Sequence, residues 1–218
     1  MHIEILVEDS SGKVLLEALV PKILGEWGDT HTWKIHHYKG IGRIPPGLTT
    51  HGDPAKRILL DQLPRVLQGY GNKPGIDAVV IVLDSDRRNC ADFLQELKTL
   101  AAHCRPAPNS LFRLAIEEME AWYLGDKVAL MAAYPKAKAR VLDGYIQDSV
   151  CGTWEVLADA VYAGGAAAIK KKGWPLPGQV KHEWAEKIGP LLDVQRNLSP
   201  SFCKFRDGLR RISAQAVT

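Results

Sequence analysis

Short apolar runs alternate with helix-like segments through the first two thirds of the chain. Four runs have the composition of β-strands and cover residues 3–7, 33–38, 78–83 and 111–116. The third run is continuously apolar and mostly β-branched, which is typical of a parallel strand covered on both faces. Helical patterns cover residues 12–24, 55–67 and 90–103, and a further helix is expected to open at Glu117. This alternation predicts an α/β sheet with right-handed crossovers.

Glycine and proline mark the boundaries of these elements. Gly25 is expected to end the first helix, and Asp53 followed by Pro54 is a favourable helix start. Pro64 is expected to kink the second helix or to divide it in two. Before that helix, residues 40–52 are rich in glycine and proline and predict a long loop.

The pattern changes after about residue 134, where lysine, alanine and glycine become frequent and no convincing strand is found. We therefore expect an α/β domain over residues 1–134 and a helical extension over residues 135–218 that packs on it. Candidate helices in the extension cover residues 153–162, 180–192 and 201–212. Ser199 or Ser201 is expected to cap the last of them.

The composition is that of an ordinary globular protein. Of 218 residues, 46% are hydrophobic and 24% are charged, and the net charge of +3 is too small to identify a partner. The apolar runs are too short for a membrane helix and the chain opens on a strand-like segment, so we expect a cytoplasmic protein without membrane contact. Four widely separated cysteines predict free thiols. His36 and His37 are adjacent on a strand, so they should point to opposite faces and have structural roles.

Three carboxylates lie where predicted strands end. Glu8 follows the first strand, and Asp84 and Asp86 follow the third. Because the carboxyl ends of parallel strands meet at one edge of the sheet, these side chains are expected to lie together. Such an oxygen-only set suits Mg²⁺ or Mn²⁺, which would relieve the repulsion between carboxylates and activate water near a phosphodiester. The alternative is that Asp84 or Asp86 is an ordinary turn or helix N-cap residue.

A family resemblance favours the metal site over that alternative. An initial strand ending in Glu and a later apolar strand ending in Asp-x-Asp resembles the Toprim pattern of topoisomerases, bacterial primases, small ribonucleases and overcoming-lysogenization-defect nucleases, across roughly residues 3–126. Three segments extend the resemblance: VLDSDRRNC over residues 82–90, AIEEMEAWYL over 115–124 and SPSFCKF over 199–205. Together they are similar to an uncharacterised Toprim-like family of small bacterial proteins. The resemblance implies a Toprim-like (Rossmann-like), mainly parallel sheet with helices on both faces.

The resemblance also implies roles for the acidic residues. Glu8 would act as a general acid or base near the reacting phosphate, and Glu8, Asp84 and Asp86 would bind the metal. Glu117 and Glu120 are three residues apart on the expected helix, so they should share a face and are further catalytic candidates. A purely structural role for each is the alternative, because the start of a helix favours acidic side chains.

Two neighbouring residues complete the candidate site. Asp9 stands where many Toprim chains have glycine, so the local turn is expected to differ, or Asp9 is an additional ligand. Trp122 is expected in the core rather than as a stacking platform for bases. Residues 40–43 lack the Lys-Ser/Thr ending of a phosphate loop and are expected to form a mobile flap.

Basic residues near these segments are candidates for phosphate contacts in DNA or RNA. Arg87 and Arg88 directly follow Asp86 and are expected at the rim of the crevice. The candidates in the extension are Lys171, Lys172, Lys204, Arg206 and Arg210. The alternative is that these short runs of charge are ordinary solvated faces.

The expected function is therefore that of a metal-dependent nuclease cleaving phosphodiester bonds in DNA or RNA. By family analogy it would be the effector of a bacterial anti-phage or genome-maintenance system with a separate ATPase subunit. The alternative is a non-catalytic Toprim-like binding or regulatory subunit of an ATPase-containing complex. Phosphotransfer on a small molecule is a weaker third interpretation, because phosphatase-like folds usually place an Asp nucleophile after the first strand, where this chain has Glu8.

Overall fold

Four parallel strands form the sheet at the centre of the computed structural model, which describes residues 1–48 and 53–214. The strands are β1 (His2–Val7), β2 (Thr32–His37), β3 (Ala78–Asp84) and β4 (Ser110–Ala115). Their order is β2-β1-β3-β4, and Ile5 lies between Ile35 and Val80 in the register. The prediction of a parallel α/β sheet is thus confirmed, with each strand within two residues of its expected bounds. The arrangement is consistent with a Rossmann-like fold.

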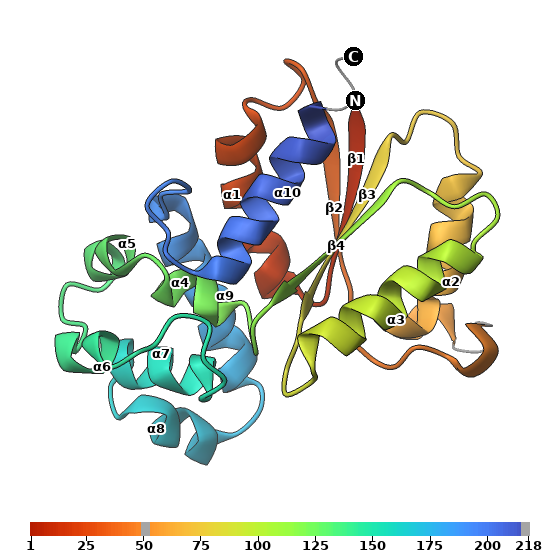
Figure 1. The fold of residues 1–218 in the computed structure, drawn as a ribbon. Coiled ribbons are helices and arrows are strands. Elements are labelled where there is room, and N and C mark those ends of the chain that lie inside the picture. Colours follow the sequence, from red (N-terminus) through yellow and green to blue (C-terminus); the bar gives the residue numbers. More distant parts are fainter. Residues whose placement is uncertain (49–52, 215–218) are drawn as a thin grey trace.

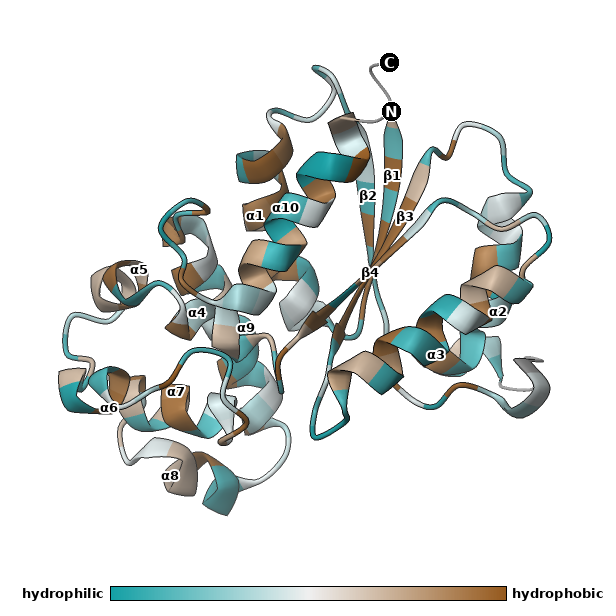
Figure 2. Ribbon diagram, viewed as in Figure 1, coloured by the Kyte–Doolittle hydropathy of each residue, from teal (hydrophilic) through white to brown (hydrophobic). Residues whose placement is uncertain are grey.

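Helices cover both faces of this sheet (Figure 1). One face packs against α1 (Ser10–Leu24) and α10 (Pro200–Ala214), and the other against α2 (Leu59–Gly71) and α3 (Cys90–His103). Alternate side chains of β1 separate accordingly: Ile5 belongs to the first hydrophobic cluster and Leu6 to the second. Figure 2 shows the apolar stretches of the strands between the two layers of helices. Burial on both faces explains the continuously apolar sequence of β3.

The ends of α1 follow from local sequence. Asp9 is its N-cap, with Oδ1 accepting a hydrogen bond of 2.7 Å from the Gly12 amide, so the helix begins two residues before the expected start. Gly25 ends it with a φ of +91°, as predicted, because glycine adopts this conformation readily.

The helix expected over residues 55–67 is instead two elements. A short 3₁₀ helix (Pro54–Lys56) is capped by Asp53, whose Oδ1 accepts from the Ala55 amide. Arg57 then adopts a left-handed conformation, with a φ of +52°, and α2 begins at Leu59. The break therefore occurs at Arg57 rather than at Pro64, which lies inside α2. Within the loop predicted over residues 40–52, another 3₁₀ helix forms (Pro46–Leu48). Residues 49–52 of that predicted loop lie outside the described residues.

The chain after β4 is helical. Besides α10, its elements are α4 (Glu120–Leu124), α5 (Lys127–Ala133), α6 (Ala139–Asp143), α7 (Thr153–Val161), α8 (Gly165–Lys172), α9 (Leu176–Ile188) and a 3₁₀ helix (Gly189–Leu191). The sequence pattern did not predict α5, α6 or α8. Trp184 of α9 and Phe205 of α10 belong to the same hydrophobic cluster as Ile5 of the sheet. Residues beyond 134 therefore share a core with the strands.

An aromatic cluster joins two of the three family-like segments. Trp122 stacks on Phe205 with ring centroids 5.0 Å apart and meets the edge of Phe202. Its indole Nε1 donates a hydrogen bond of 3.0 Å to Ser201 Oγ. Ser199 accepts from the Phe202 amide and caps α10. Trp122 is fully buried, so its predicted place in the core is confirmed.

Two simpler expectations are also met. All four cysteines are free thiols. In the two described ranges of the chain, every helix is too short or too polar to cross a membrane.

Candidate functional site

Glu8 and Asp84 lie side by side at the carboxyl ends of the two central strands. Val7 pairs with Val82 in the register, so Glu8 leaves β1 close to the point where β3 ends in Asp84. Glu8 Oε2 and Asp84 Oδ1 are both buried, and neither has a hydrogen-bond partner among the residues that the structure describes. They line a cavity of about 10 Å³, enough for one water-sized particle. Its wall is completed by Asp9, Ser11, Gly12, Val82, Met119, Glu120, Tyr123 and Lys181.

Gly12 allows α1 to approach this cavity closely. A Cβ atom at this position would lie 2.6 Å from Val7 Cγ2 and 2.9 Å from Met119 Sδ. Asp9 closes the same side, and its carboxylate accepts hydrogen bonds from the Gly12 amide and the Ser11 hydroxyl. Asp9 is therefore a helix cap whose side chain borders the cavity.

A lysine from the extension enters the acidic cluster. Lys181 of α9 places Nζ 3.1 Å from Glu118 Oε1 and 3.4 Å from Glu120 Oε1. Glu120, the first residue of α4, is only 4% exposed. The sequence pattern does not indicate Lys181 as a site residue, because a single lysine on an amphipathic helix carries no signal of its own. Its role depends on α9 packing against α1, a contact between distant parts of the chain.

Burial and neighbouring charges raise the pKa of three carboxyl groups at the cavity, those of Glu8, Asp84 and Glu120. Burial, then the charges of Asp9 and Asp86, raise the pKa of Glu8 to about 7. Burial and the neighbouring Glu8 raise the pKa of Asp84 well above its usual range. Burial also raises the pKa of Glu120 to about 7, although Lys181 opposes the shift. The cavity therefore disfavours additional negative charge and favours a cation.

Lys181 remains a cation in this setting. Burial alone would lower the pKa of its ammonium group, but Glu120 and Glu118 outweigh that effect and raise the pKa above its usual range. The ammonium group thus supplies one positive charge to a cluster of several carboxylates.

These shifts predict how stability changes with pH. Glu120 has a raised pKa in the fold, so the stability that it contributes is present below its unfolded value of 4.5 and is lost as the pH rises through about 7. Urea unfolding in EDTA should show that Glu120→Gln gains stability over wild type between pH 5 and 8, on the order of 3 kcal/mol. A difference between the two proteins that stays constant over this range would contradict the assignment.

Asp86 lies at the rim rather than inside the cavity. The chain turns at Ser85, and Asp86 adopts a left-handed conformation with a φ of +48°, its amide donating to Glu117 O. Its side chain is 51% exposed and lies 3.4 Å from Arg88 Nη1. The two aspartates therefore do not extend from one strand in the same direction, because β3 ends at Asp84. Asp86 still lies near enough to Glu8 to affect its pKa.

Glu117 does not share a helix face with Glu120, and that expectation is wrong. It precedes α4 in a left-handed turn with a φ of +61°, and its own amide donates to Ser85 Oγ. Its carboxylate accepts hydrogen bonds from the amides of Cys151, Gly152 and Thr153. It thus satisfies free N–H groups at the start of α7. This arrangement makes Glu117 a structural anchor of the extension.

The basic candidates occupy several different surroundings. Arg87 and Arg88 are exposed after Asp86, and the Arg88 guanidinium lies 4.7 Å from the Phe93 ring centroid. Arg206 is turned inward, where it pairs with Asp207 and donates to Val194 O.

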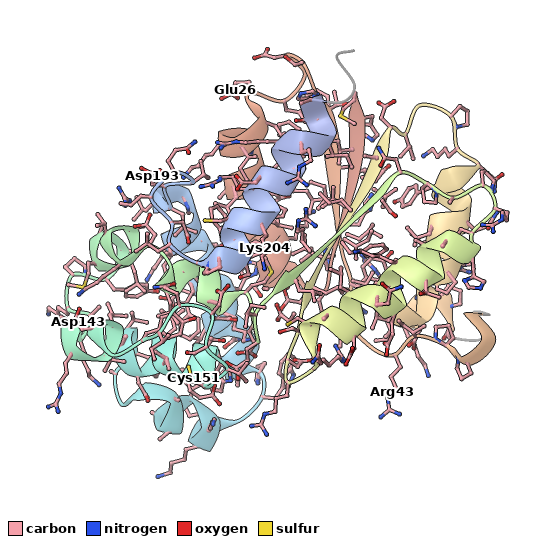
Figure 3. All side chains as sticks on the ribbon, in the orientation of Figure 1. Glu26, Arg43, Asp143, Cys151, Asp193 and Lys204 are labelled. Atoms are coloured by element: carbon pink, nitrogen blue, oxygen red, sulfur yellow. The ribbon has the colours of Figure 1, made fainter. Side chains whose placement is uncertain are left out.

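The other four candidates lie on two helices of the extension. Lys171 and Lys172 are exposed at the end of α8, whereas Lys204 is exposed on α10 (Figure 3). Arg210 is partly buried on α10, and its charge acts on Asp207. Within α10, therefore, Lys204 is the more exposed of the two.

The segment expected to be a flap is attached at its start. The Gly40 amide donates to Glu8 O, and the Leu59 amide donates to Gly40 O. The Arg43 amide donates to Asp61 Oδ1, while its side chain projects away from the molecule (Figure 3). Residues 40–43 are thus held between the end of β1 and the start of α2.

The adjacent histidines point to opposite faces of β2, as predicted. His36 Nε2 lies 2.6 Å from Oε2 of the buried Glu4, on the sheet face that α2 covers. Burial, then the charges of Arg57 and Lys13, lower the pKa of His37, which lies near Asp9 and Lys13 of the other layer. The two rings therefore have separate structural environments.

The residues at the cavity offer donors for one cation, but they do not form a complete set of metal ligands. Within residues 1–48 and 53–214, no group of three or more His, Cys, Asp or Glu side chains is already arranged to hold a metal ion. The two unpartnered carboxylate oxygens are nevertheless hard donors of the kind that Mg²⁺ and Mn²⁺ prefer. Comparisons with family models, curated proteins and solved structures found no match to this chain.

Proposed function

We propose that this protein is a Toprim-type, metal-dependent nuclease that cleaves phosphodiester bonds in DNA or RNA. The observation that carries the proposal is the pair of buried, unpartnered oxygens of Glu8 and Asp84, which come from adjacent strands and border one small cavity. A buried carboxylate oxygen without a partner is costly, and a divalent cation would remove that cost.

Glu8 and Asp84 would hold the ion, with Asp86 available from the rim. Once bound, Mg²⁺ or Mn²⁺ would supply positive charge for a phosphate and lower the pKa of water. Burial raises the pKa of Glu8 to about 7 in the metal-free protein, and a bound cation would lower it, so Glu8 would bind the ion as a carboxylate and could then accept a proton from water. Lys181 keeps Glu120 in place beside the cavity by a direct ion pair.

Arg87 and Arg88 would contact the nucleic-acid backbone. They immediately follow Asp86 and are exposed, so their guanidinium groups can reach phosphates outside the cavity. Such contacts depend on charge and not on base sequence, and they weaken as salt increases.

The test is cleavage of supercoiled plasmid and of end-labelled RNA by the purified protein, with Mg²⁺, with Mn²⁺ and with EDTA. We expect cleavage of at least one substrate with a divalent ion and none in EDTA. The absence of cleavage from both substrates with both metals would overturn the nuclease assignment.

A regulatory subunit is the second candidate, and the lack of a preformed three-residue metal group in the described part of the chain favours it. In this case the domain would bind or regulate an ATPase-containing complex, in an anti-phage system by analogy with the family resemblance. Thermal stabilisation by Mn²⁺ without any cleavage would support this candidate.

A further inference from the structure

The outer edge of β4 has backbone groups that pair with no other strand within residues 1–48 and 53–214. β4 is the last strand of the sheet, next to β3. The Val79 amide donates to Asn109 O and the Ser85 amide donates to Ala115 O, so the odd-numbered residues of β4 turn their backbone groups toward β3. Even-numbered residues, such as Leu114, therefore turn their N–H and C=O groups outward. An edge of this kind can pair with an additional strand.

A groove follows this edge. One part, of about 580 Å³, and a second, of about 280 Å³, share Phe112 and Arg113. Figure 1 shows β4 between α10 on one side and α3 on the other, and residues of both helices line the groove. Leu94, Leu114 and Ile116 give it an apolar floor. The groove thus places outward-facing backbone groups of β4 beside apolar side chains.

Arg113 covers only part of the edge. Its guanidinium donates to Phe112 O and to Lys204 O, which ties β4 to α10. The backbone of Leu114, one residue further along, has no such cover in the described part of the chain. The end of the edge near the acidic cavity is therefore the more open one.

The charges that remain free in the groove are positive. Lys98, Lys204 and Arg211 line it and are exposed (Figure 3 labels Lys204), and the two lysines form no ion pair within residues 1–48 and 53–214. The acidic lining residues are already engaged: Asp207 pairs with Arg206, and Asp148 accepts hydrogen bonds from the Ser199 hydroxyl and the Ser201 amide. A segment that fills the groove would therefore gain most from acidic side chains.

We propose that the outer edge of β4 binds an extended, acidic segment of a partner protein as a fifth strand of the sheet. Regularly alternating backbone donors and acceptors match a peptide backbone. A nucleic-acid strand fits less well, because the floor is apolar and Phe112, the one aromatic side chain lining the described groove, is only 5% exposed. A second copy of the chain fits less well too, because its own α3 and α10 would flank its edge and meet these helices.

The test selects peptides from a displayed random library and measures synthetic versions by fluorescence anisotropy. We expect enriched peptides to alternate apolar and acidic residues and to lack proline. Leu114→Pro removes one outward N–H without breaking the β3 ladder, so it should weaken binding about tenfold while the protein stays folded. Should this variant fail to fold, the double substitution Lys204→Glu and Arg211→Glu tests the same proposal through charge. Lys171→Glu with Lys172→Glu is its matched control on α8 and should bind as wild type does.

Several results would overturn the proposal. One is a selection in which the wild-type protein enriches no peptides beyond those that the Leu114→Pro protein enriches. Another is a peptide affinity that changes neither in Leu114→Pro nor in the Lys204→Glu and Arg211→Glu double variant. A dimer in sedimentation velocity that Leu114→Pro dissociates would assign the edge to a second copy. An oligonucleotide that loses affinity on charge reversal, and that the selected peptides do not displace, would assign it to nucleic acid.

Discussion

Asp84→Asn should lower metal-dependent cleavage on the order of a thousandfold and at the same time stabilise the metal-free protein at pH 8. Cleavage should fall because the substitution keeps the shape of the side chain but removes a negative charge that would bind the ion. A bound metal ion lowers the activation free energy of such a reaction by several kcal/mol. The gain follows because burial and the neighbouring Glu8 raise the pKa of Asp84, so its ionised form is disfavoured in the fold.

The combination of these two effects separates a metal ligand from a structural residue. Thermal unfolding should show a rise in Tm with Mn²⁺ for wild type that is absent from Asp84→Asn. Asp143→Asn is the matched control, because Asp143 is exposed and forms an ion pair with Lys127 on the surface. Equal cleavage by wild type and Asp84→Asn would contradict the proposed role, as would equal stabilisation of the two proteins by Mn²⁺.

Lys181→Met should destabilise the protein by about 3–5 kcal/mol at pH 8 and by less at pH 5.5. Without the ammonium group, Glu118 and Glu120 lose their ion pairs and Asp84 loses a neighbouring positive charge. At the lower pH, Glu120 can accept a proton, because its pKa is already raised to about 7 and would rise further. Urea unfolding at the two pH values measures the difference.

Two further variants test whether the lost charge, rather than lost packing, causes the destabilisation by Lys181→Met. Lys187→Met removes a lysine from the same helix, but from an exposed pair with Glu183, so its effect should remain below about 1 kcal/mol. Adding Glu120→Gln to Lys181→Met should restore part of the lost stability, because it removes one of the unpaired carboxylates. A loss that does not depend on pH and is not relieved by Glu120→Gln would point to packing instead.

Local sequence determined the four strands and the adjacency of Glu8 and Asp84. Strand composition depends on burial, and β3 is apolar throughout because helices cover both of its faces. Since the ends of parallel strands meet at one edge, the positions of Glu8 and Asp84 along the chain were enough to place them together. Gly25 likewise ended α1 through its own conformational freedom.

The tertiary structure alone decided which acidic residues face the cavity and what balances their charge. Glu117 and Glu120 have the spacing of a helix face, but the left-handed turn at Glu117 sends its carboxylate to the start of α7, more than thirty residues away. Lys181 reaches Glu120 across 61 positions in the chain, through the packing of α9 on α1. Periodicity describes neighbours within one element, and it carries no information about contacts that form only when distant elements pack together.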